Sequence, residues 1–154
     1  MMPEKETLER ARHDKEEGKS ASMQAGEFVR EEIHHVREGK HGARSPQQAI
    51  AIGLSKARRA GVKLPPPAKG KASAHTRSKA AQDLRKGESL GKKRSSGKRA
   101  SAVLSALKRE KRSSASTAAL SKQAGSSARK RGPAARKKSA LKAAHTRQSV
   151  RKAA

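Results

Sequence analysis

The chain contains no cysteine, tryptophan or tyrosine, and Phe28 is its only aromatic residue. Without cysteine it can form neither disulfides nor thiolate metal sites. Leucine, isoleucine, valine and phenylalanine together account for only 18 of the 154 residues. A chain so poor in these residues and so highly charged usually cannot bury enough apolar surface to offset the entropy lost on folding. The composition therefore predicts a mostly disordered protein with a small all-α unit.

Long hydrophobic runs are also missing. A membrane-spanning helix needs about 18 or more consecutive apolar residues, and no segment of this sequence approaches that length. The amino-terminal residues are acidic and lack the apolar core of a secretory signal. We therefore expect a cytoplasmic protein without a membrane span.

Acidic residues become scarce after Lys40. Residues 41–154 hold 31 of the 39 basic residues but only three of the 13 acids, which gives this segment a net charge of +28. Residues 1–40 have a net charge of −2. A long cationic segment of this kind is typical of chains that bind a polyanion.

Three regions follow from these patterns. Residues 1–24 are polar and of mixed charge, and we expect a frayed helix or disorder. Residues 25–67 predict a helical hairpin, with helices at about 26–39 and 46–60, that ends in a proline-rich stop. Residues 68–154 form a basic tail rich in alanine, serine, lysine and arginine, in which we expect only transient helices.

The second helix of the hairpin has clear end signals. Ser45 suits the N-cap, Pro46 the first helical position and Gln48 the reciprocal position of a capping box. Gly61 suits a left-handed cap, over which Val62 could fold back. The few large apolar residues of the hairpin predict marginal stability, so that self-association through Ile52 or a bound partner would complete it.

Helix-permissive stretches in the tail lie at about 99–112 and 133–152, where alanine, lysine and arginine are good helix formers. Pro133 suits the first turn of the second stretch. Clusters of like charge oppose compaction, so we expect these helices to form mainly when phosphates neutralise them.

The basic clusters are the main functional signal. Small residues separate them and would let the chain lie close to a phosphate backbone. We predict sequence-independent binding of nucleic acid, DNA in preference to RNA, and a nucleoid-associated role as one form of it. The predicted phosphate-contacting residues are Lys56, Arg58, Arg59, Lys92, Lys93, Arg94, Lys98, Arg99, Lys108, Arg109, Lys111, Arg112, Arg129, Lys130, Arg131, Arg136, Lys137, Lys138, Arg147, Arg151 and Lys152.

Other interpretations remain open. The last-turn cations Lys56, Arg58 and Arg59 also complement a helix dipole, and the tail could serve solubility alone. The 26–61 hairpin could instead be a protein-interaction module that the tail tethers to nucleic acid or ribosomes. Direct base reading is not expected, because asparagine is absent and aromatic residues nearly so.

No enzyme, cofactor, small-molecule substrate or metal site is predicted. Nothing pairs a nucleophile with a base in a buried pocket. His34 and His35 are adjacent and face different sides of a helix, and no third metal ligand is placed beside them. Ser101 and Ser113 follow basic residues and fit basic-directed phosphorylation, although a role as spacer is the favoured explanation of serine there.

The segment Gly26–Pro67 resembles a small bacterial domain of unknown function. The resemblance is carried by the stretch Ser45-Pro46-Gln47-Gln48-Ala49-Ile50-Ala51-Ile52-Gly53-Leu54-Ser55-Lys56-Ala57-Arg58-Arg59-Ala60-Gly61. It implies a bacterial, cytosolic protein and brings over no functional residues. The tail is similar in composition to those of linker histones and bacterial histone-like proteins.

Overall fold

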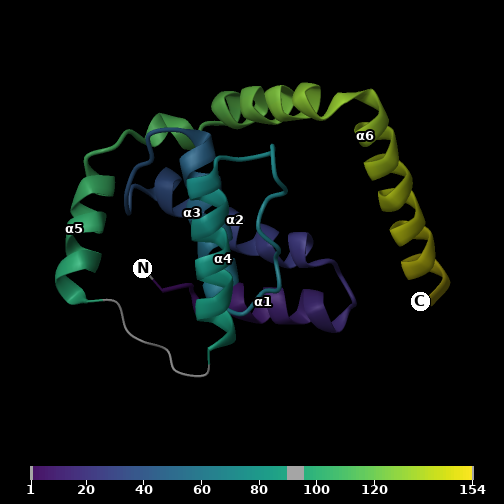
Figure 1. Ribbon diagram of the computed structural model, residues 1–154, viewed down its shortest axis with the longest axis horizontal. Helices are drawn as coiled ribbons and strands as arrows, with labels where there is room; N and C mark the ends of the chain where they lie inside the picture. Colours follow the sequence, from purple (N-terminus) through teal and green to yellow (C-terminus); the bar gives the residue numbers. More distant parts are fainter. Residues whose placement is uncertain (1, 90–95, 154) are drawn as a thin grey trace. The chain divides into compact units, whose positions relative to one another are not determined.

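The computed structural model describes residues 2–89 and 96–153, with side chains to residue 149. The chain forms two compact units, an N-terminal unit (Met1–Ser116) and a C-terminal unit (Thr117–Ala154). The described elements are helical (Figure 1), namely α1 (Lys5–Glu16), α2 (Ala21–Glu38), α3 (Pro46–Arg59), α4 (Ala74–Glu88), α5 (Gly97–Lys108), the 3-10 helix η1 (Arg112–Ala115) and α6 (Thr117–Ala153).

The predicted hairpin is present as α2 and α3. Ser45 caps α3 by accepting a hydrogen bond from the backbone N–H of Gln48 at 3.2 Å, and Pro46 occupies the first turn. The Gln48 side chain accepts from the N–H of Arg44 at 2.6 Å, one residue earlier than a standard capping box requires. The cap predicted for this helix is therefore confirmed, with a small shift in the reciprocal bond.

Both hairpin helices end on a left-handed glycine. Gly39 has φ 77° and Gly61 has φ 96°. After α3, the N–H of Val62 donates to the carbonyl of Ala57 at 3.1 Å and that of Gly61 donates to Arg58 at 3.0 Å. These two bonds make a Schellman motif, and they return Val62 to the core as its position predicted.

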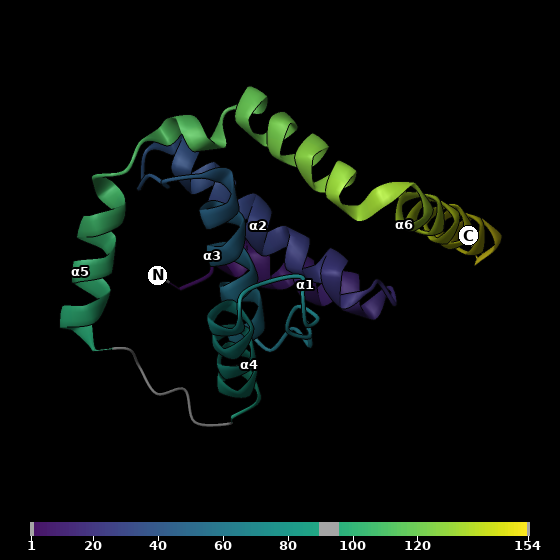
Figure 2. The same cartoon turned by 45° about the horizontal axis from the view of Figure 1, so that its top comes forward.

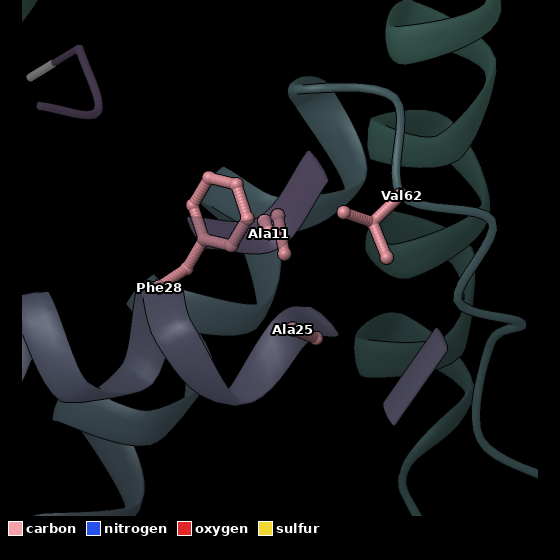
Figure 3. Packing of buried hydrophobic residues seen from close by; sticks show 5 residues of the cluster. Ala11, Ala25, Phe28 and Val62 are labelled. Carbon is pink, nitrogen blue, oxygen red and sulfur yellow. The ribbon is translucent and has the colours of Figure 1, made fainter. Parts of the chain in front are cut away.

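The core of the N-terminal unit is built mainly from small side chains. Phe28 on α2 is 1% exposed and packs with Ala11 of α1, Ala25 of α2, Ala57 of α3 and Val62 (Figure 3). Because alanine has almost no side-chain entropy to lose, it lets helices pack closely at low cost. The partly buried Ala21, Leu54 and Leu64 pack against this cluster.

A close approach of α2 and α3 requires Gly53. A Cβ atom at this position would lie 2.7 Å from Cα of Val29 and 3.0 Å from the carbonyl oxygen of Phe28. Both atoms belong to the backbone of α2, so a side chain at residue 53 would force the two helices apart. The glycine thus brings the polar faces of α2 and α3 into contact as well as their apolar faces.

The prediction of a mostly disordered chain is wrong. The hairpin is completed within the chain, because α1 packs on α2 and α4 packs on α3. The polar lead of residues 1–24 forms α1 and the start of α2. A count of large apolar residues does not detect this core, because its buried members include seven alanines. Such a count also omits the charged side chains that pair inside the protein.

The basic tail is also helical rather than transiently so. Ser73 and Ser96 cap α4 and α5 by accepting hydrogen bonds from the N–H groups of Thr76 and Arg99. In α6 the backbone breaks at Gly132, and a second helical segment begins at Pro133 as predicted (Figure 2). Repulsion between like charges opposes these helices by only about 0.2–0.5 kcal/mol per pair. The intrinsic helix propensity of alanine, lysine and arginine, summed over the length of each helix, outweighs it.

Within the described part of the chain, no helix combines the length and apolar character needed to cross a membrane.

We predict that Gly53→Val lowers the free energy of unfolding by about 1–3 kcal/mol, because the added methyl groups overpack the α2–α3 contact. Gly26→Val is the matched control, since a Cβ atom at this α2 position meets nothing within 4 Å. Urea denaturation followed by circular dichroism measures both. Equal effects of the two substitutions would contradict the close approach.

Candidate functional site

Most of the predicted phosphate-contacting residues lie on the surface. Lys92, Lys93 and Arg94 fall outside the described residues, and Arg151 and Lys152 lie in α6 beyond the described side chains. The exposed cations are Lys98, Arg99, Lys108, Arg109, Lys111, Arg112, Arg129, Lys130, Arg131, Arg136, Lys137, Lys138 and Arg147.

The C-terminal unit has eleven basic residues and no acid to pair with them. Its two basic triplets, Arg129–Arg131 and Arg136–Lys138, lie on either side of the break at Gly132. Consecutive helical residues are 100° apart, so each triplet presents cations on three sides of the helix. Lys122 and Lys142 are also exposed on α6 and were not among the predicted contacts, because each stands alone in the sequence.

Arg58 and Arg59 in the last turn of α3 are engaged within the protein. Arg58 is 6% exposed and donates hydrogen bonds to the carbonyls of Leu64 at 3.1 Å and Pro65 at 3.3 Å. Burial lowers the pKa of Arg58, and the nearby Asp83 carboxylate partly opposes that shift. Arg59 lies 3.7 Å from Asp83 on α4, which also accepts a hydrogen bond from Ser55. These arginines therefore hold the proline-rich segment and α4 against α3.

Lys56 is the centre of a buried polar cluster, which consists of Glu31, Glu32 and His35 of α2, His41 of the following loop, and Lys56 of α3. All five residues are at most 4% exposed. The Lys56 Nζ atom lies 3.0 Å from Oε1 of Glu31 and 2.7 Å from Oε2 of Glu32. Sequence reasoning placed Lys56 among the phosphate contacts, but the structure places it in the interior, opposite two carboxylates.

Two histidines complete the buried polar cluster, and each is held by one ring nitrogen. Nδ1 of His41 lies 3.0 Å from the carbonyl oxygen of Gly42. Nε2 of His35 lies 2.9 Å from Oε1 of Glu4. Hydrogen bonds from His35 and Lys40 lower the pKa of Glu4 to about 2. Because a carbonyl and an ionised carboxylate can only accept, both of these ring nitrogens carry protons.

The remaining polar atoms of the cluster lack hydrogen bonds. They are both carboxylate oxygens of Glu32, Nδ1 of His35 and Nε2 of His41. Nε2 of His41 lies only 3.1 Å from Oε1 of Glu32, but this ion-pair contact and that of Lys56 with Glu32 do not have hydrogen-bond geometry. A buried polar group without a hydrogen bond costs about 1–3 kcal/mol. Several such atoms in one place would be satisfied if a ligand or an ion were bound among them.

Sequence analysis missed this cluster because it found no third ligand beside the adjacent His34 and His35. The structure instead joins Glu32 and His35, three residues apart, with His41, which the turn at Gly39 returns to the same place. One ligand atom from each of these residues lies within 4.8 Å of the others. The sequence signal for this cluster was the position of His41, two residues after the glycine that ends α2.

Residues 12–69 match a family of unknown function (DUF6496). The chain therefore contains a small domain of unknown function, as the resemblance indicated. The matched segment includes the five residues of the buried polar cluster and none of α4, α5 or α6. Neither the curated proteins nor the solved structures contain a match to the chain.

We predict that Lys56→Met lowers the free energy of unfolding by roughly 3–5 kcal/mol, because it leaves two adjacent buried carboxylates without a cation. Lys98→Met removes the same charge from an exposed position and should change stability by at most about 0.5 kcal/mol. Chemical denaturation of both variants measures the difference. Equal stabilities would show that Lys56 does not neutralise the two glutamates.

Proposed function

We propose that the protein binds nucleic acid without regard to sequence, mainly through α6. The observation that carries this proposal is a helical unit whose sequence has eleven cations and no acid, and in which the nine cations with described side chains are exposed. With no carboxylate partner in the unit, these charges repel one another in the free protein. Phosphates remove that repulsion, and they release condensed counterions as they bind.

The distribution of charge around α6 favours duplex DNA. The major groove admits an α-helix and has phosphates along both walls. The second segment of α6, from Pro133, has about 21 residues and a length of about 32 Å. Because its cations point to three sides, those on opposite sides can reach both walls at once. The cations of α5 and η1 would add phosphate contacts.

Several features support binding that ignores base sequence. Single-strand binders stack bases on several aromatic side chains. The chain has a single phenylalanine, which is buried. The resemblance to a small bacterial domain supports placing this activity in the bacterial cytoplasm, at the nucleoid.

The alternative role of the 26–61 hairpin as a protein-interaction module is less favoured. Its apolar faces pack against α1 and α4 within the N-terminal unit. Among the described side chains, the exposed large apolar residues are Met2, Leu8, Met23, Val103 and Leu141, which come from four different helices and the amino-terminal segment.

Neutralising the two triplets of α6 tests the proposal. Each phosphate contact on duplex DNA contributes about −0.9 to the slope of log K against log salt concentration, so about ten contacts give a slope near −9. Replacing the six cations of Arg129–Arg131 and Arg136–Lys138 with glutamine should make the slope shallower by about 5. Fluorescence anisotropy with a random-sequence duplex at several salt concentrations measures it.

The control variant loses the same charge from exposed positions of the N-terminal unit and should keep a slope close to that of the unmodified protein. An equal loss in both variants would show that net charge alone drives binding and would exclude α6 as the interface. A slope shallower than about −3 for the unmodified protein would overturn the proposal. The six control substitutions to glutamine are at Lys5, Arg12, Lys15, Arg30, Lys63 and Lys69.

A further inference from the structure

The buried polar cluster has an arrangement that the nucleic-acid proposal does not use. Glu32, His35 and His41 are 0%, 3% and 2% exposed. They come from α2 and from the loop after it, and the rings of His35 and His41 meet edge to face at 6.1 Å between centroids. The polar atoms that these residues turn toward one another have no hydrogen bonds.

The orientation of each histidine is that of a metal ligand. Histidines that bind metal usually donate their other ring N–H to a carbonyl or carboxylate, which fixes the tautomer and leaves the second nitrogen as the donor to the ion. His41 donates from Nδ1 to the Gly42 carbonyl, and His35 donates from Nε2 to Glu4. The other ring nitrogens face carboxylates without making a hydrogen bond: Nε2 of His41 lies 3.1 Å from Oε1 of Glu32, and Nδ1 of His35 lies 4.0 Å from Oε1 of Glu31.

We infer that Glu32, His35 and His41 form a binding site for one divalent transition-metal ion of the zinc class. Two imidazoles and one carboxylate are a known ligand set for zinc, and three protein ligands leave a fourth position open. One ion would contact His35, His41 and Glu32 at once. A proton shared between His41 and Glu32 would still leave Nδ1 of His35 without a hydrogen bond.

Lys56 and Glu31 complete the surroundings of the site. Lys56 contacts Oε2 of Glu32 at 2.7 Å, which leaves Oε1, the oxygen nearer His41, as the ligand. Glu31 is already satisfied, because it accepts from Lys56 and from the backbone N–H of Glu4. These contacts orient the Glu32 carboxylate in the way that outer-shell groups orient metal ligands.

The site lies where the α2–α3 loop contacts the end of α5. The N–H of Gly42 donates to the carbonyl of Leu107 at 2.8 Å, and that of Ala43 donates to Lys111 at 3.2 Å. A bound ion would fix His41, and with it this loop, against α2. We therefore assign the site a structural role, in which metal binding stabilises the folded N-terminal unit.

The test uses the full-length protein after removal of metals with a chelator. Titration with Zn²⁺, followed by calorimetry, should show one ion bound per chain, and the midpoint of thermal unfolding should rise with Zn²⁺ and fall again with excess chelator. Co²⁺ bound at the same site should give the visible absorption of a low-coordinate complex with nitrogen and oxygen ligands. No binding and no thermal shift at about 100 µM Zn²⁺ would overturn the inference.

Two substitutions remove a ligand nitrogen and keep the structural hydrogen bond. The side-chain amide of His41→Asn can still donate to the Gly42 carbonyl, and that of His35→Gln can still donate to Glu4. Each should keep the chelated protein folded and weaken Zn²⁺ binding by at least about tenfold. His34→Gln and His13→Gln, at exposed positions, should bind as the unmodified protein does. Loss of binding in these controls alone would assign the ion to the surface and refute the buried site.

If either ligand variant is unfolded after chelation, Glu32→Gln provides the second test, since it keeps the size of the side chain and removes its charge. Its titration should show the same loss of Zn²⁺ affinity. Retention of one tightly bound ion by folded Glu32→Gln and by a folded histidine variant would contradict the assigned ligands.

Discussion

The contact between Lys56 and the paired carboxylates of Glu31 and Glu32 is the interaction on which the N-terminal unit depends. It joins α2 to α3 beside a core built mainly from small side chains. Gly53 makes the contact possible by letting the two backbones approach. Buried charges are costly to desolvate. The ion pairs of Lys56 therefore determine how α2 and α3 pair more than they increase the net stability of the fold.

Lysine and arginine serve two purposes in this chain, and the purpose of each residue depends on whether an acid lies nearby. Some cations of the N-terminal unit meet carboxylates or carbonyls, as Lys56, Arg58 and Arg59 do. Cations of α6 have no acid within their unit, and those with described side chains are exposed. The change in composition near residue 40 does not mark this division, because Lys56, Arg58 and Arg59 lie after it and still build the fold.

Local signals predicted the α2–α3 hairpin well, because Ser45, Pro46 and Gly61 act through bonds to close neighbours in the sequence. The folding of the whole chain could not be predicted from a count of large apolar residues, since Ala25, Ala57 and Gly53 contribute through close packing. The buried polar cluster was missed for a related reason. Lys56 and Glu31 are 25 residues apart, and only the pairing of two helices shows that the lysine faces inward.

Lysine acetylation of the native protein, mapped by mass spectrometry with and without a random-sequence DNA duplex, tests this division of charge most directly. The account predicts that Lys56 stays unmodified in both conditions, because it is 2% exposed. Lys130, Lys137 and Lys138 should react in the free protein and become protected on DNA. Reaction of Lys56 in the free protein, or α6 lysines that react equally with and without DNA, would contradict it.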